Sequence, residues 1–314
     1  MRVELTTKIF VQGEHVGEVL ALLRHFAQGR HEWVVSPIDT DTVADYLDSH
    51  AQGLAKGYSE LARKAAVNHA AWSVADARPL VRIQPEELSD HVADLERPAI
   101  VAVENNRSDR CFLEVIAKVF GAPEILLAVK RDWLVIDNGG GLAGAGRRAK
   151  EERGKFRLIP RVAALFDSDR MVPASSEKAH ALAERLRGHD ILVHVLEFRE
   201  AENYIPNRVL HTLKPYHLIH PRIDALKRLS HEQRGHFDMK RGFDKTSGVP
   251  DSQKVLFAGV PSQVIAKLGQ GFGSDVIKQL GERADTLSET DFAGLGPDVC
   301  RELRSILEML RKIV

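Results

Sequence analysis

Residues 162–169, with the sequence VAALFDSD, contain the pattern that decides the fold: an unbroken apolar run that is followed at once by Asp167 and Asp169. A short apolar run without polar alternation favours a strand that is buried on both faces, as strands of parallel sheets are. In open α/β sheets, ligands gather beyond the carboxyl ends of such strands. The sequence therefore predicts an α/β protein with both aspartates at the functional edge of a sheet.

Three further apolar runs lie before and after this one, and each leads into a polar turn. The runs and their turns are 99–103 (AIVAV) with Glu104, 133–136 (WLVI) with 137–141 (DNGGG), and 191–196 (ILVHVL) with 199–204 (REAENY). Residues 110–120 and about 175–187 have the spacing of amphipathic helices. This alternation of strands and helices predicts a parallel sheet flanked by helices over residues 97–210.

The chain on either side of this segment has mainly helical patterns. Residues 1–96 begin with an alternating apolar stretch over 3–11 and continue into helical patterns, including 41 to about 74, which predicts an N-terminal α+β or helical domain. Residues 211–314 are expected to be helical, apart from a loop near 242–250. The apolar face of the last helix is Leu303, Ile306, Leu307, Leu310 and Ile313. Such a face is more typical of a core than of a dimer seam, because one helix of this length cannot sustain a coiled coil.

The composition excludes several classes of protein. With 314 residues, 44% hydrophobic and 28% charged, the chain is expected to fold into two or three packed units. Lys plus Arg and Asp plus Glu both number 44, so any nucleic-acid contact must come from local basic patches. Cys111 and Cys300 are too few for a disulfide framework or a Cys-rich zinc site. Without a secretory signal or an apolar run of about 20 residues, we expect a cytoplasmic protein with no membrane contact.

Carboxylates follow the predicted strands, and they are the ligands that Mg²⁺ or Mn²⁺ prefers. They are Glu104, Asp167, Asp169, Glu200 and Glu202. Residues two apart in an extended segment point to the same side, so Asp167 and Asp169 could grip one ion together. Two such ions about 4 Å apart support cleavage of phosphodiester bonds. An isolated Asp-x-Asp is more often a solvated loop or a helix cap, so the order of all these acids along the chain is what favours a metal site.

This order resembles the Toprim domain, the catalytic fold of type II and IA topoisomerases, DnaG-type primases and the overcoming-lysogenisation-defect (OLD) nucleases. The likeness covers roughly residues 98–210. Its motifs are 103–113 (VENNRSDRCFL), 138–141 (NGGG), 167–169 (DSD) and 199–205 (REAENYI). The Glu-Asn-Tyr within the last motif points to the OLD-like branch, which is associated with anti-phage defence.

The resemblance implies a role for each acid by its position. Glu104 would be a metal ligand or general acid/base, and Asp167 with Asp169 would be the magnesium pair. Glu202, with Glu200 in support, would complete a second metal position. Asp109 would match the acid that follows the glutamate. The family usually has glycine directly after the glutamate and the next acid about four residues on, whereas here Asn105 follows and Asp109 is five residues on.

Other motifs have two interpretations each. Lys240, in residues 238–242 (DMKRG), resembles a Lys-x-Gly element in which the lysine stabilises charge on the scissile phosphate, but it could equally be a solvated lysine. Basic residues after the glycine-rich turn could contact a nucleic-acid backbone or be solvated. They are Arg147, Arg148 and Lys150. His211, His217 and His220 are expected on helical surfaces rather than at the site, and Cys111 is expected to be a buried structural thiol rather than a nucleophile.

The function implied by the resemblance is that of a Mg²⁺- or Mn²⁺-dependent endonuclease that cleaves nucleic acid. Relatives of this branch often act beside an ATPase, and the chain has no Walker-type motif, so a separate ATPase or sensor protein is the expected partner. A catalytically silent Toprim-like scaffold that binds a partner or nucleic acid stays open, since Asp109 is displaced and the net charge is zero. A phosphatase with Asp167 as nucleophile is a third interpretation. The oligomeric state is left open, a homo-oligomer included.

Overall fold

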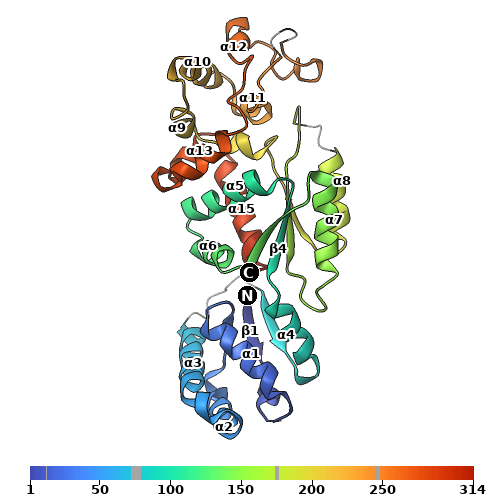
Figure 1. Cartoon of the computed structure of the whole chain (residues 1–314), viewed down its shortest axis with the longest axis vertical. Helices are drawn as coiled ribbons and strands as arrows, with labels where there is room; N and C mark the ends of the chain where they lie inside the picture. The colour runs from blue at the N-terminus through green and yellow to red at the C-terminus, as the bar shows by residue number, and fades with distance from the viewer. Residues whose placement is uncertain (12, 72–78, 174–176, 245, 247) are drawn as a thin grey trace.

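The computed structural model describes residues 1–11, 13–71, 79–173, 177–244, 246 and 248–314. Over these residues the chain is a mostly helical α/β protein with two parallel sheets, one of three strands and one of four. Figure 1 shows an elongated arrangement, with the smaller sheet at one end, the larger sheet in the middle, and helices α9 to α12 at the other end.

The larger sheet contains β4 (Ala99–Val103), β5 (Leu134–Asn138), β6 (Val162–Phe166) and β7 (Leu192–Val195). All neighbours are parallel, and the order across the sheet is β5-β4-β6-β7. The strands predicted at 99–103 and 162–166 are confirmed to the residue. The sheet grows outward from β4 to β5 and from β6 to β7, so it reverses direction between β4 and β6. This reversal is the switch point at which open α/β sheets bind ligands.

Helices cover both faces of this sheet (Figure 1). One face lies under α5 (Asn106–Val119), α6 (Pro123–Lys130) and α15 (Val299–Arg311), and the other lies under α7 (Leu142–Arg153) and α8 (Glu177–Arg187). Successive residues of β4 point to opposite faces, so Val101 and Val103 pack in one core and Ile100 and Ala102 in the other. Burial on both faces explains why the strands are continuous apolar runs.

The N-terminal region has a parallel sheet of its own. Its strands are β1 (Arg2–Leu5), β2 (Glu32–Val34) and β3 (Leu80–Ile83), in the order β2-β1-β3, and its helices are α1 (Val16–Ala27), α2 (Thr40–His50), α3 (Gln52–Ala71) and α4 (Leu88–Glu96). The alternating stretch at 3–11 is a strand only to Leu5, since Thr7–Phe10 forms a 3₁₀ turn. The helical pattern from 41 is divided at Ala51, and its end at 72–74 lies outside the described residues.

The C-terminal region surrounds one face and one end of the larger sheet. Its helices are α9 (Asn207–Leu210), α10 (Tyr216–Leu226), α11 (His231–His236), α12 (Ser262–Lys267), α13 (Val276–Arg283), α14 (Glu289–Ala293) and α15. Their apolar residues share one core with β4 and α5. The predicted apolar face of the last helix is confirmed as core, because Leu303, Ile306 and Leu310 are fully buried. Among the described residues, no helix is both long and apolar enough to cross a bilayer.

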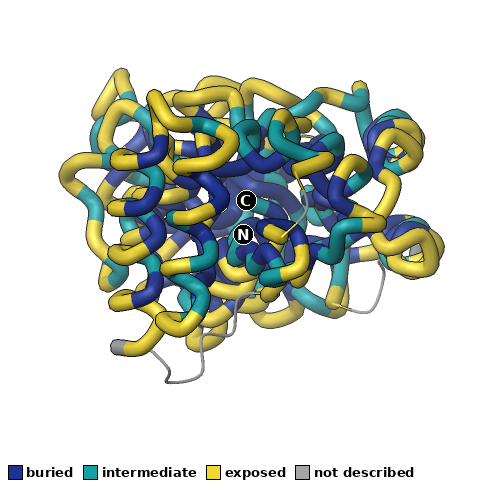
Figure 2. The backbone as a smooth tube through the Cα atoms, turned by 90° about the horizontal axis from the view of Figure 1, so that it is seen from below, coloured by how far each residue is buried: buried dark blue, intermediate teal, exposed yellow. Residues whose placement is uncertain are grey.

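A buried arginine joins the three regions. Arg161 is completely buried and donates to the carbonyl oxygens of Leu95 (3.2 Å), Arg97 (2.8 Å) and Ile313 (2.7 Å). Beside it, buried Asp94 accepts hydrogen bonds from the backbone N–H groups of residues 157–159. The two ends of the chain meet at the same place, where the Met1 amino group donates to the Val314 carbonyl (Figures 1 and 2). These contacts connect the larger sheet to the N-terminal region and to the end of α15.

Candidate functional site

The carboxyl ends of β4 and β6 bring Glu104 and Asp167 together. Val103 pairs with Leu165 in the sheet, so the residues that follow the two strands are neighbours. The backbone N–H of Asp167 donates to Glu104 Oε1 over 3.1 Å. Both side chains are half-buried. Two residues that are 63 positions apart in the sequence are therefore neighbours at the switch point of the sheet: the apolar runs predict acids at strand ends, and the strand order makes these two adjacent.

Asp169 and Asp109 lie on the turns beside this pair. Asp169 has a left-handed backbone (φ 51°), and its N–H donates to the Arg199 carbonyl over 3.0 Å. Asp109 is buried in the first turn of α5 and accepts hydrogen bonds from Asn105 N (2.9 Å) and Ser108 Oγ (3.0 Å). Asn105 is the N-cap of α5 with an extended backbone (φ −136°), a conformation that does not require glycine. This geometry accounts for asparagine at the position after Glu104.

Burial raises the pKa values of Glu104, Asp109 and Asp167, and repulsion between neighbouring acids adds to the effect at Glu104 and Asp167. Burial, followed by the charge of Asp169, raises the pKa of Glu104 to about 7. Burial, followed by Asp109 and then Glu104, raises the pKa of Asp167 well above its ordinary value. Burial also raises the pKa of Asp109. Within the part of the chain that the structure describes, none of Glu104, Asp109, Asp167 and Asp169 forms an ion pair with a basic side chain. A bound cation would relieve this repulsion.

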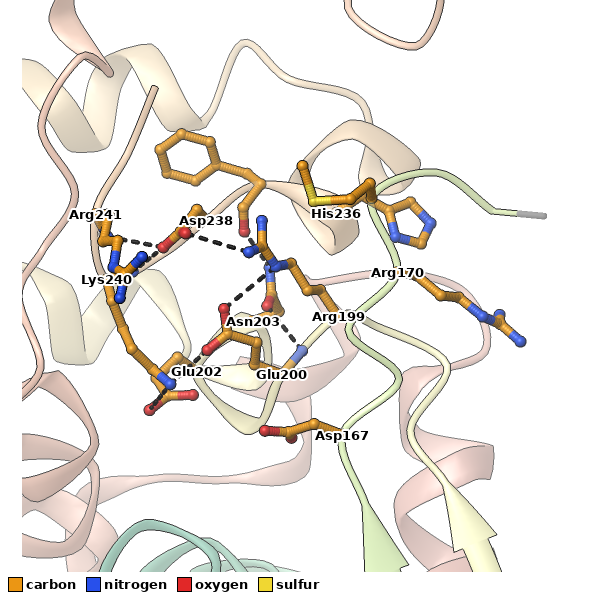
Figure 3. Close-up of polar contacts among 12 residues, drawn as sticks. Asp167, Arg170, Arg199, Glu200, Glu202, Asn203, His236, Asp238, Lys240 and Arg241 are labelled. Carbon is orange, nitrogen blue, oxygen red and sulfur yellow. Dashed lines mark hydrogen bonds and ion pairs between the residues drawn. The ribbon is translucent and has the colours of Figure 1, made fainter. Parts of the chain in front are cut away.

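Glu200 and Glu202 form a second acidic group, after β7, and this group has basic partners. Both lie buried at the 3₁₀ turn Ala201–Tyr204. Lys240 Nζ lies 2.5 Å from Glu200 Oε2 and 3.2 Å from Glu202 Oε1 (Figure 3). Arg199 lies 3.3 Å from Glu200 and 3.2 Å from Asp238. Here the negative charge is compensated by the chain itself.

A backbone contact links the two acidic groups. The N–H of Ala201, between Glu200 and Glu202, donates to Asp167 Oδ1 over 3.1 Å. Figure 3 shows Asp167 beside the turn that carries both glutamates. The charges of Glu202 and Glu200 are also among the causes that raise the pKa of Asp167. The acids that the sequence singles out therefore lie around the same edge of the sheet, with Lys240 beside Glu200 and Glu202.

The Lys-x-Gly element requires its glycine. Gly242 has a left-handed backbone (φ 79°), and a Cβ there would lie 2.5 Å from the backbone of Gln270. Only glycine tolerates both conditions. The close approach lets residues 239–241 run against 271–273, which fixes the backbone of Lys240.

Asn203 and Tyr204 are structural residues whose contacts no sequence pattern predicted. Asn203 Nδ2 donates to the carbonyls of Arg234 (2.8 Å) and Phe237 (2.9 Å), and so ties the turn after β7 to the segment that leads to Lys240. The Tyr204 hydroxyl donates to Glu302 Oε2 over 2.6 Å. Within the Glu-Asn-Tyr motif, Glu202 therefore contacts Lys240, whereas Asn203 and Tyr204 stabilise the turn. Arg199 and Asp238 lie inside motifs that the sequence singles out, but their pairing with each other is set by tertiary packing and was not predicted.

The glycine-rich turn after β5 shapes the site by close packing. The N–H of Gly141 donates to the Glu104 carbonyl over 3.1 Å, and a Cβ at Gly139 would lie 2.0 Å from the backbone N of Ala145. Of the basic residues that follow, Arg148 pairs with Asp137 and Glu152. Arg147 pairs with Glu151. The turn therefore fixes the backbone at Glu104.

The histidines and the cysteine singled out in the sequence have other contacts. The His211 ring packs on His220 at 5.2 Å between centroids, and its Nε2 lies 3.2 Å from Lys227 Nζ. Cys111 Sγ donates to the Ile277 carbonyl over 3.3 Å, and burial raises the pKa of its thiol. A raised pKa disfavours the reactive thiolate, which is the state a nucleophile needs.

The residues fit a hard divalent cation by their chemistry. Carboxylate oxygens are the donors that Mg²⁺ and Mn²⁺ prefer, and Glu104, Asp109, Asp167 and Asp169 lie around one edge of the sheet. Among the described residues, no three His, Cys, Asp or Glu side chains already converge as a metal-binding group. Asp167 and Asp109 accept from backbone N–H groups, and Glu202 binds Lys240.

Fold and site together define an α/β protein with a carboxylate-rich edge at the switch point of a four-stranded parallel sheet. Comparison with family models, with curated proteins and with solved structures finds no match to this chain. Its function is therefore inferred from the geometry of the site.

Proposed function

We propose that the chain is a Mg²⁺- or Mn²⁺-dependent nuclease with a Toprim-like core. One observation carries the proposal: Glu104 and Asp167 leave the ends of adjacent parallel strands, meet at the switch point, and have no basic partner among the described residues. Structural carboxylates are normally paired or solvated, because clustered negative charges repel one another. An uncompensated cluster at a ligand-binding edge is better explained by catalysis than by packing.

The acids nearest the switch point would hold the metal ion. They are Glu104, Asp167 and Asp169, with Asp109 behind them. When bound, the metal ion supplies positive charge that neutralises a phosphate and lowers the pKa of water. Glu104 would act either as a ligand to the ion or as the base that takes a proton from water. Lys240, whose side chain is 36% exposed, can reach a phosphate oxygen of the substrate.

Local basic residues support a nucleic-acid substrate although the net charge is zero. Arg107, in the first turn of α5, and Arg241, next to Lys240, are both exposed on the segments that carry the acids. Such residues can position a phosphate backbone without reading its sequence. The expected consequence is binding that weakens as salt rises.

Cleavage by the purified chain tests this proposal. Supercoiled plasmid, single-stranded DNA and tRNA are incubated with Mg²⁺, Mn²⁺ or EDTA, with Glu104→Gln in parallel. We expect cleavage of at least one substrate that needs the metal ion and is lost in the variant. Cleavage that persists in EDTA, or that Glu104→Gln retains, would contradict the proposal.

A catalytically silent scaffold is the second candidate, and one observation favours it. Lys240 already occupies the space between Glu200 and Glu202, and no complete metal-binding group is formed among the described residues. A scaffold predicts no thermal stabilisation by Mg²⁺, whereas a nuclease predicts stabilisation.

The anti-phage role and the separate ATPase or sensor partner belong to the nuclease proposal. Copurification with proteins from an adjacent gene would test them.

A further inference from the structure

The backbone around Lys240 is held by hydrogen bonds on two sides. Three hydrogen bonds of 2.8–3.1 Å join the backbone of residues 239–241 to that of residues 271–273. From the other side, Asp238 Oδ1 accepts from the N–H groups of Lys240 (3.1 Å) and Arg241 (2.8 Å). Asp238 is itself held by Arg199. The position of the Lys240 side chain is therefore prepared by the fold, unlike that of a lysine on a free surface loop.

The ammonium group of Lys240 lies where two acids converge. Glu200 and Glu202 are only 6% and 3% exposed, so water cannot neutralise them effectively. Lys240 Nζ contacts both, at 2.5 Å and 3.2 Å. Glu104 and Asp167, on the neighbouring strand ends, have no such partner among the described residues. The acids of the site therefore divide into a group with a resident cation and a group without one.

We propose that Lys240 is the second cation of this site, so that the chain binds a single divalent metal ion, on the side of Glu104 and Asp167. This inference rests on the proposed function, in which two cations flank the reacting phosphate. A metal ion on the same oxygens of Glu200 and Glu202, at about 2.1 Å, would lie within roughly 5 Å of the ammonium and would compete with it. The Lys240 side chain is 36% exposed, so a phosphate oxygen can approach it from solvent.

Metal counting tests the inference without measuring activity. Bound Mn²⁺ per chain is determined by equilibrium dialysis for the full-length wild type, for Lys240→Gln, and for Lys240→Arg as the matched control that keeps the charge. We expect one ion in the wild type, one in Lys240→Arg and two in Lys240→Gln, because loss of the ammonium frees Glu202 and the Glu200 oxygen that does not face Arg199. Circular dichroism confirms that the variants are folded, and Glu202→Gln in the Lys240→Gln background should return the count to one.

Two ions in the wild type, or one ion in Lys240→Gln, would overturn the role assigned to Lys240. Cleavage of nucleic acid measured on the same samples separates this from the proposed function. Two ions with cleavage would refute the inference and leave the nuclease intact. The expected counts without cleavage of any substrate would support the inference and count against the nuclease. A wild type that binds no Mn²⁺ would refute both.

Discussion

Replacing Glu104 with glutamine should stabilise the metal-free protein. Glutamine keeps the size of the side chain and an oxygen that can accept from Asp167 N–H, but it removes a charge that burial and Asp169 disfavour. The pKa of Glu104 rises from 4.5 to about 7, and one pKa unit corresponds to about 1.4 kcal/mol. The shift corresponds to about 3 kcal/mol at most. Because the side chain is only half-buried, solvent screening reduces the expected gain to about 1–2 kcal/mol.

The stability gained in Glu104→Gln depends on pH. Between the ordinary pKa of 4.5 and the folded value of about 7, the folded protein binds a proton at Glu104 that the unfolded chain does not. Stability of the wild type therefore falls as pH rises through this window. The gain in Glu104→Gln should be small at about pH 5 and complete above about pH 7.5.

Thermal unfolding in EDTA measures the effect. At about 2–4 °C for each kcal/mol, Glu104→Gln should unfold about 2–8 °C above the wild type at pH 8 and within about 1 °C of it at pH 5. Glu60→Gln, at an exposed position of α3, is the matched control and should leave the unfolding temperature unchanged at both pH values. An equal unfolding temperature at pH 8, or an equal gain at both pH values, would refute the electrostatic argument.

Two further predictions follow from the same contacts. Mg²⁺ at about 100 times its Kd should stabilise the wild type by about 2.7 kcal/mol and should leave an Asp167→Asn variant nearly unchanged. Thermal unfolding measures both effects. Equal stabilisation of the two proteins would argue against Asp167 as a ligand. Asn203→Ala should cost about 2–4 kcal/mol in urea unfolding, because the Phe237 carbonyl loses its Asn203 donor and the Arg234 carbonyl keeps only the Phe237 N–H. A loss below about 0.5 kcal/mol would show that the turn after β7 does not depend on this side chain.

The larger sheet could be predicted from the sequence because both of its faces are buried. Full burial makes each strand an unbroken apolar run, and a run such as 162–166 has a clear beginning and end. The parallel arrangement then places Glu104 and Asp167 at the same edge of the sheet, but their adjacency depends on the strand order, with β4 beside β6, which the apolar runs do not determine. The smaller sheet was harder to predict, because β2 has only three residues and β3 begins at the exposed Leu80.

The contacts around Lys240 could not be predicted, because they depend on segments far apart in the chain. The lysine meets Glu202 only since Asn203 binds the carbonyls of Arg234 and Phe237, and since residues 239–241 run against 271–273. The contacts of Arg161 could not be predicted either. Its partners include the backbone carbonyls of Leu95 and Ile313, and a backbone acceptor does not require a particular residue type.

The most direct measurement is Mn²⁺-dependent cleavage of plasmid, single-stranded DNA and tRNA by the wild type and Asp167→Asn in parallel. The acids at the switch point predict cleavage by the wild type and a loss on the order of 10²-fold or more in the variant, with both proteins folded. Equal cleavage by the two proteins would contradict the assignment of this edge of the sheet as the active site.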